Sequence, residues 1–174
     1  FILIIILCAF VDKKLRKYWE DMSTAQKDKY LSDTTLYKDA VEYYNGKLVP
    51  LDDDRTFQLL DSLTEFKKID RLPFYFHVFN QIASKSDGAL SEVMGYHCYS
   101  IIKKYYVYAF TYFDRADLNK NKLHVLYAMF IAYNYPKKDT DAMKEMIAKD
   151  PAAKKWKKIF NEFFAEIDRV HKNK

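Results

Sequence analysis

The scarcity of glycine and proline is the feature that most restricts what this chain can fold into. Only 3 of its 174 residues are glycine and 4 are proline. β-Sandwiches and β-barrels need many tight turns, and tight turns depend heavily on these two residues. So few of them in a chain of this length favour long helices joined by short loops. The sequence therefore predicts an all-α fold.

Apolar residues recur at helical spacing along most of the chain, and residues that cap or end helices separate the apolar runs. The expected boundaries are Ser23, Asp33 or Thr34, Asn45-Gly46, Asp52-Asp53-Asp54, Asp70, Ser86-Asp87-Gly88, Asp117, Asp139 or Thr140, and Asp150-Pro151. They define about eight helices with connectors of a few residues. We predict a single-domain multi-helix bundle over residues 11–174; the alternative is a short α-solenoid-like array.

Two segments of this pattern bear on packing. The run YYVYAFTYF (105–113) is apolar or aromatic on nearly every side, which predicts a buried helix, or a strand as the alternative. Ser91 and Gly95 stand one helical turn apart, and small residues at this spacing let a neighbouring helix approach closely. The functional alternative for the same stretch is a binding groove lined by Ser91, Glu92 and Tyr96.

No familiar catalytic or metal-binding motif is present. Asp117, Asn119 and Asn121 alternate as the first ligands of a calcium-binding EF-hand do, but Lys122 and Ala128 stand where that loop needs Gly and Glu. The four histidines do not share the spacing of one helical turn that a helical metal site needs. Gly-rich phosphate loops and nucleophile elbows are also lacking. We therefore assign no catalytic residue, metal or cofactor and predict that the protein is not an enzyme.

The positive charge comes mainly from lysine. The formal net charge is +5, and lysines alternate with acidic residues along the polar faces, as on a solvated surface. A nucleic-acid groove usually favours arginine, so we expect no nucleic-acid partner. Lys154–Lys158 surrounds Trp156 with four lysines. On a helix, Trp156 would lie in the core with the lysines in solvent; contact with a membrane surface is the competing interpretation.

The first ten residues, FILIIILCAF, carry no charge. This run has the length of the apolar region of a signal peptide and is too short to span a bilayer. Residues 1–10 are therefore interpreted as the remnant of a signal peptide or lipoprotein leader. Cys8 is the candidate site of lipid attachment, and simple cleavage is the alternative because Leu7 stands where a small residue is usual. Cys98 is expected to be a buried structural thiol.

Residues 52–99 contain the segments LDSL, RLPFYFHVFN and SDGALSEVMG. This region resembles uncharacterised helical envelope lipoproteins of Bacteroidetes-type bacteria. The resemblance implies export, to the periplasm or to an outer-membrane-associated location, together with lipid attachment. It implies no catalytic or binding residues.

Tyrosine and phenylalanine are unusually abundant, with 15 and 13 residues. This exceeds what a core of this size should need, and such aromatic side chains are enriched at binding surfaces. The leading hypothesis is an exported, membrane-anchored, non-enzymatic module that binds a protein or envelope partner through an aromatic groove. One alternative is a periplasmic immunity-type protein that blocks a toxin. Another is a hydrolase whose carboxylates, such as Asp53, Asp87 and Glu92, meet across helices.

Overall fold

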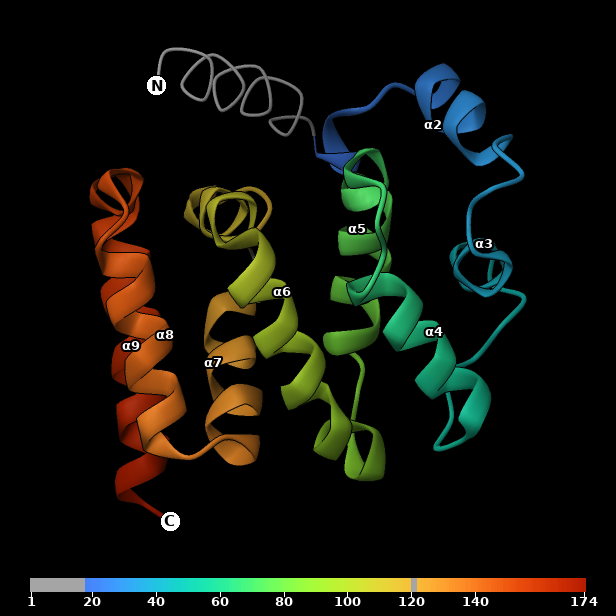
Figure 1. Cartoon of the computed structure of the whole chain (residues 1–174). Coiled ribbons are helices and arrows are strands. Elements are labelled where there is room, and N and C mark those ends of the chain that lie inside the picture. Colours follow the sequence, from blue (N-terminus) through green and yellow to red (C-terminus); the bar gives the residue numbers. More distant parts are fainter. Residues whose placement is uncertain (1–17, 120–121) are drawn as a thin grey trace. The chain divides into compact units, whose positions relative to one another are not determined.

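The computed structural model describes residues 18–119 and 122–174. These residues form eight α-helices and three short 3-10 helices, and they contain no strand (Figure 1). The prediction of an all-α fold with about eight helices is confirmed. The apolar leader and Cys8 lie outside the described residues. Contacts group the chain into two compact units, of which the first ends at Gln81 and the second begins at Ile82.

The first unit contains four α-helices and two 3-10 helices. They are η1 (Trp19–Asp21), α2 (Thr24–Leu31), α3 (Lys38–Tyr44), α4 (Asp54–Thr64), η2 (Ile69–Arg71) and α5 (Leu72–Ala83), whose last two residues belong to the second unit. Ser23 begins α2 with a capping box: its hydroxyl accepts from the backbone N–H of Gln26, whose side chain accepts from the backbone N–H of Ser23. The predicted break at Ser23 is confirmed.

The start of α3 differs from the prediction. Neither Asp33 nor Thr34 caps this helix; α3 begins at Lys38, and its N-cap, Tyr37, forms no side-chain cap. The predicted cap is wrong because Asp33 is used elsewhere, in a turn with Thr35 and in an ion pair with Arg71. By contrast, Asp53 caps α4 as predicted, since its carboxylate accepts from the backbone N–H of Thr56 at 2.8 Å.

Aromatic side chains form the core of the first unit. Trp19 is almost fully buried, and its ring centroid lies 4.9 Å from that of Phe74 and 5.4 Å from that of Tyr44. The aromatic segment that contains Pro73 forms α5, and its buried residues include Tyr75 and Phe79. The Trp19–Tyr44 contact is edge-to-face, a geometry that adds a stabilisation beyond the area that the rings bury.

The second unit consists of four α-helices and one 3-10 helix. They are α6 (Gly88–Asp114), α7 (Leu123–Asn134), α8 (Lys137–Ala148), η3 (Pro151–Trp156) and α9 (Lys157–Lys172). Successive α-helices run in alternating directions, and α7 packs against both α6 and α9 (Figure 1). The aromatic run 105–113 is helical and forms the last part of α6, beyond a kink at Tyr105.

Two helices of the second unit, α7 and α8, begin at residues other than those predicted. Asp117 does not cap α7; its carboxylate pairs with Arg115, and Lys122, in the left-handed conformation with φ 49°, is the N-cap of α7. Helix α8 begins at Lys137, directly after Pro136, rather than at Asp139 or Thr140. Pro136, whose ring fixes φ, precedes α8. In both cases the predicted capping side chain bonds elsewhere or lies within the helix.

The interior of the second unit is also aromatic. Phe110 on α6 contacts Trp156 and Phe163, with ring centroids 6.1 Å and 5.3 Å away. Trp156 is 4% exposed, whereas the four lysines around it are exposed. The prediction that Trp156 belongs to the core is confirmed. Cys98 is fully buried, also as predicted, and burial raises the pKa of its thiol well above the usual value.

Among the residues that the structure covers, no helix has both the length and the apolar character needed to cross a membrane.

Candidate binding surface

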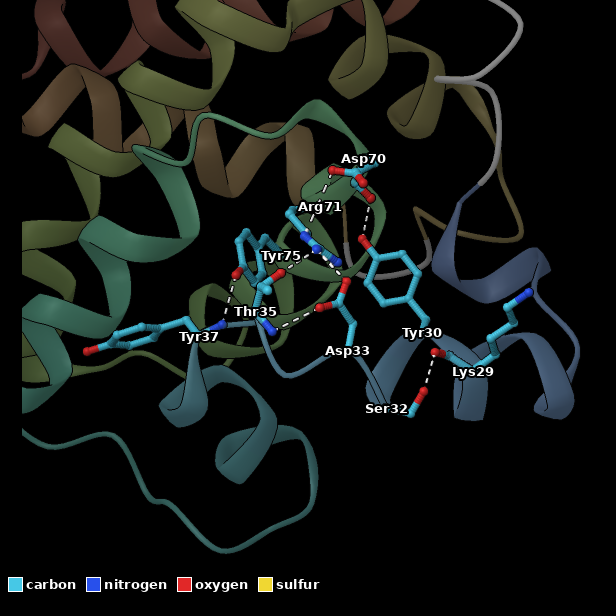
Figure 2. Close-up of polar contacts among 9 residues, drawn as sticks. All are labelled: Lys29, Tyr30, Ser32, Asp33, Thr35, Tyr37, Asp70, Arg71 and Tyr75. Carbon is cyan, nitrogen blue, oxygen red and sulfur yellow. Dashed lines mark hydrogen bonds and ion pairs between the residues drawn. The ribbon is translucent and has the colours of Figure 1, made fainter.

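A network of polar contacts surrounds Arg71, the last residue of η2 (Figure 2). The Arg71 guanidinium is buried and donates to Asp33 Oδ2 at 2.5 Å and to Thr35 Oγ1 at 2.6 Å. Its Nε lies 3.9 Å from a carboxylate oxygen of Asp70. The guanidinium carbon is 5.8 Å from the centroid of the Tyr30 ring, a cation–π arrangement. We call these residues the Arg71 cluster.

Further bonds connect the end of α2 and the segment between α2 and α3 to the same place. The Tyr30 hydroxyl donates to the backbone oxygen of Asp70, and the backbone N–H of Tyr37 donates to the Tyr75 hydroxyl at 2.9 Å. Figure 2 shows these contacts converging on one side of the segment. A stretch without regular secondary structure is thus fixed by side chains that replace the missing helical hydrogen bonds.

The electrostatics of the Arg71 cluster do not suit acid–base chemistry near neutral pH. Bonds from the Thr35 backbone N–H and from Arg71 lower the pKa of Asp33 to about 2. Burial raises the pKa of Tyr30 far above its usual value. A general acid or base works best when its pKa lies close to the operating pH. The Arg71 cluster is therefore best explained as a structural anchor of the first unit.

A second polar group lies in the second unit around His124. One ring nitrogen of His124 is 3.1 Å from Glu162 on α9, and the other is 2.7 Å from the side chain of Asn119. Asn119 also donates to the backbone oxygen of Phe113 at 2.8 Å. Burial lowers the pKa of His124. Because both ring nitrogens are engaged, this group holds the loop before α7 against α9.

Metal binding receives no support from these groups. Within residues 18–119 and 122–174, no three His, Cys, Asp or Glu side chains are arranged to hold a metal ion.

An exposed stripe of α6 is the third candidate. Glu92, Tyr96, Tyr99 and Lys103 follow one another at intervals of four, three and four residues, so they share one face of the helix. Tyr96 is 51% exposed, Glu92 and Lys103 are exposed, and Tyr99 is partly exposed. Tyr135, just beyond α7, stacks on Tyr99 with ring centroids 4.1 Å apart and planes 16° apart. We call these five residues the tyrosine surface.

Gly95 explains how Tyr135 reaches Tyr99. A Cβ atom at Gly95 would lie 2.2 Å from Asn134 Nδ2 and 2.4 Å from the backbone oxygen of Phe130. Only glycine therefore allows α6 to approach the end of α7 so closely, and the residue after Asn134 is Tyr135. The close approach predicted from Ser91 and Gly95 is found at Gly95. On α6, Gly95 directly precedes Tyr96 of the tyrosine surface.

The hydroxyls of Tyr99 and Tyr135 stay protonated at physiological pH. Burial raises the pKa of Tyr99, and the nearby Asp139 carboxylate raises it further. Burial is also the main cause of the raised pKa of Tyr135, to which Tyr99, Tyr96 and Asp139 add. Each ring thus offers an apolar face together with a neutral hydroxyl that can donate and accept hydrogen bonds. This combination suits binding better than proton transfer.

The residues predicted for a groove are only partly brought together. Glu92 and Tyr96 lie one turn apart on the tyrosine surface. Ser91 lies about 100° around the helix from Glu92, and its hydroxyl donates to the backbone oxygen of Gly88 at 2.6 Å. The sequence reasoning missed Tyr99, Lys103 and Tyr135. The spacing of Tyr99 and Lys103 from Tyr96 could have indicated the first two, whereas Tyr135 depends on how α6 and α7 pack.

The tyrosines are divided between core and surface. Of the 15, six are buried: Tyr18, Tyr43, Tyr75, Tyr108, Tyr112 and Tyr127. The others are at least partly exposed, and the most exposed are Tyr96 and Tyr133. The abundance of tyrosine is therefore not accounted for by the core alone.

Comparisons of the chain with protein-family models, with curated proteins and with solved structures find no match. The resemblance of residues 52–99 to helical envelope lipoproteins accordingly stays a prediction.

Proposed function

We propose that this chain is an exported, non-enzymatic binding protein that contacts its partner through the tyrosine surface. The observation that carries the proposal is the stacked pair Tyr99–Tyr135 beside the exposed Tyr96. Tyrosine offers a large contact area at a low cost in side-chain entropy, because it has only two rotatable side-chain torsions. The stacking contact further restricts Tyr99 and Tyr135, so little additional ordering is needed when a partner binds.

The other polar groups favour binding over catalysis. The hydrogen bonds described above for the Arg71 guanidinium and for the His124 ring are made to residues of the same group. The pKa of Asp33 is lowered to about 2, and burial lowers the pKa of His124. The tyrosine surface, in contrast, places apolar ring faces between charged residues at its two ends. A partly apolar centre with a polar rim is the usual composition of a protein–protein interface.

Export is supported by the sequence alone. The uncharged run at residues 1–10 has the length of a signal-peptide core, and Cys8 within it is the proposed site of lipid attachment. A partner in the cell envelope, either a protein or an envelope component, fits this location. Fractionation of the source cells, with mass spectrometry of the mature N-terminus, tests this part of the proposal.

Site-specific photo-crosslinking tests the binding surface. A photoreactive phenylalanine analogue replaces Tyr96 in one variant and Tyr133 in a control. Tyr133 is 60% exposed and lies on the side of α7 where Lys174 contacts its ring. We expect a discrete crosslinked product in intact source cells from position 96, at several times the yield from position 133. Equal yields from both positions, or no product from position 96, would contradict the proposal.

A further inference from the structure

The exposed stripe of α6 has a symmetric pattern of side chains. Read from either end, Glu92, Tyr96, Tyr99 and Lys103 have the same spacing, with two tyrosines at the centre and opposite charges at the ends. We propose that a second copy of this chain binds the tyrosine surface, with α6 packed antiparallel against α6 of the other copy. This inference rests on the proposed function, because it names a partner for the same surface.

The direction of pairing follows from charge. In the antiparallel arrangement, Glu92 of each copy faces Lys103 of the other, and Tyr96 faces Tyr99. A parallel arrangement would place Glu92 against Glu92 and Lys103 against Lys103, and such like-charge contacts are strongly unfavourable. The antiparallel arrangement has two-fold symmetry, which is the commonest symmetry of protein dimers and uses the same patch on both copies.

Both charged ends of the stripe are available for this pairing. Glu92 and Lys103 are exposed, and neither takes part in an ion pair among the described residues. The Lys103 ammonium lies over the Tyr99 ring, 5.8 Å from its centroid, so this lysine already borders the aromatic centre of the stripe. Unlike the Arg71 guanidinium, neither group would have to give up an internal ion pair in order to contact a second copy.

The stripe is also straight enough to lie along a second helix. It ends before the kink at Tyr105, and no residue with non-helical dihedral angles interrupts it. From Glu92 to Lys103 it spans about 16 Å, or three turns. Tyr135 widens it on one side through its stack on Tyr99. A contact confined to three helical turns buries less area than a standard stable interface, which buries about 800 Å² per partner. We therefore expect a dimer that dissociates on dilution.

Sedimentation equilibrium of the full chain over a wide concentration range tests the inference. The wild-type mass should rise from 20.8 kDa toward twice that value with increasing concentration. Glu92→Lys and Lys103→Glu should each weaken dimerisation roughly tenfold or more, because each brings like charges together. The double variant Glu92→Lys/Lys103→Glu should restore it. Lys154→Glu is the matched control, with the same charge change at an exposed lysine on η3, and should leave dimerisation unchanged.

The outcomes separate the two proposals. A wild-type chain that remains monomeric at all concentrations overturns the dimer, as does a folded double variant that fails to dimerise. Circular dichroism establishes folding for each variant. If the chain is monomeric but position 96 crosslinks to a different protein, the dimer falls and the binding function stands. If position 96 gives no crosslink and no dimer forms, both proposals fall.

Discussion

The contacts within the first unit differ in kind from those within the second, although both units are helical and rich in aromatic residues. In the first unit, the segment between α2 and α3 is fixed by bonds to the buried Arg71 guanidinium. In the second unit, α6 and α7 meet at Gly95, where the absence of a side chain permits close contact. The strength of hydrogen bonds between charged side chains depends on whether those side chains are protonated. A close contact between helices depends instead on the volume of the side chains at the contact.

Each unit contains one of the two tryptophans, which allows the two to be followed separately. Trp19 in the first unit is 1% exposed, and Trp156 in the second is 4% exposed. The variant Trp156→Phe leaves a fluorescence signal from the first unit alone, and Trp19→Phe leaves a signal from the second. Both backgrounds are used in the predictions below.

The largest effect is expected at Arg71. Arg71→Ala removes the bonds to Asp33 and Thr35, so the first unit should lose about 2 kcal/mol of unfolding free energy, the usual contribution of hydrogen bonds to a charged group. Urea unfolding followed through Trp19 measures this loss. The matched control is Arg55→Ala, since Arg55 also bonds two carboxylates, those of Asp39 and Glu42, but is half exposed. Its unfolding midpoint should change little, because exposed ion pairs contribute little.

Comparable losses for Arg71→Ala and Arg55→Ala would show that burial does not distinguish the two arginines. The Arg71 cluster would then not be the anchor of the first unit.

A smaller loss is expected at Gly95. Alanine is favoured over glycine inside a helix by about 1 kcal/mol, but its Cβ would overlap the Phe130 backbone oxygen, and such overpacking costs about 1–3 kcal/mol. Gly95→Ala should therefore destabilise the second unit, as measured by urea unfolding through Trp156. Gly46→Ala is a useful contrast, because Gly46 has φ +70° and open space around it. Its effect should arise from backbone strain of about 1 kcal/mol and appear in the Trp19 signal.

A second test separates the two atoms that a Cβ at Gly95 would meet, the Asn134 side chain and the Phe130 backbone oxygen. Adding Asn134→Ala to Gly95→Ala removes the side-chain overlap but leaves the Phe130 oxygen in place. We therefore expect the double variant to recover little of the lost stability. Full recovery would mean that the Asn134 side chain, rather than the backbone, limits the approach of α6 and α7.

The smallest effects concern pH, and they should differ between the units. Burial lowers the pKa of His124 below its usual 6.5, so the unfolded chain binds a proton first and the second unit loses stability as the pH falls below about 6.5. The pKa of Asp33 is lowered from 3.8 to about 2, so its contribution to the first unit is present above pH 3.8 and is lost only as the pH falls toward 2.

Urea unfolding midpoints measured across this pH range test the difference. As the pH is lowered, the urea midpoint reported by Trp156 should begin to fall at a higher pH than the midpoint reported by Trp19. His124→Gln should flatten the pH dependence of the Trp156 midpoint below pH 6.5. Asp33→Asn should flatten the pH dependence of the Trp19 midpoint near pH 3. Identical pH profiles for the two tryptophans would contradict the assignment of these residues to separate units.

Local features of the fold were predictable because they depend on short-range chemistry. Ser23 and Asp53 act as caps as expected, since a cap needs only a hydroxyl or carboxylate next to free backbone N–H groups. The same rule failed at Asp33 and Asp117, because arginines compete for those carboxylates. Asp117 pairs with Arg115, two residues earlier in the chain, but Asp33 pairs with Arg71, which is 38 positions away and which no local pattern identifies.

The candidate surface was predictable only along one helix. Glu92 and Tyr96 were identified from the sequence, and the spacing of Tyr99 and Lys103 is readable there as well. Tyr135 lies beyond α7, and its place on the surface depends on the contact between Gly95 and Asn134. A helical repeat shows which residues share a face, but it does not show which other helix lies beside that face.

The helical fold of this chain follows from its amino acids, because glycine and proline are too scarce for a turn-rich fold and apolar residues recur at helical spacing. The burial of Trp156 and Cys98 follows in the same way, since both lie on apolar helix faces. The packing of the folded chain was needed to show which carboxylates Arg71 and Arg115 bind, and that Tyr135 stacks on Tyr99. These outcomes depend on distances between segments far apart in the chain, or on competition between partners, and helical periodicity encodes neither.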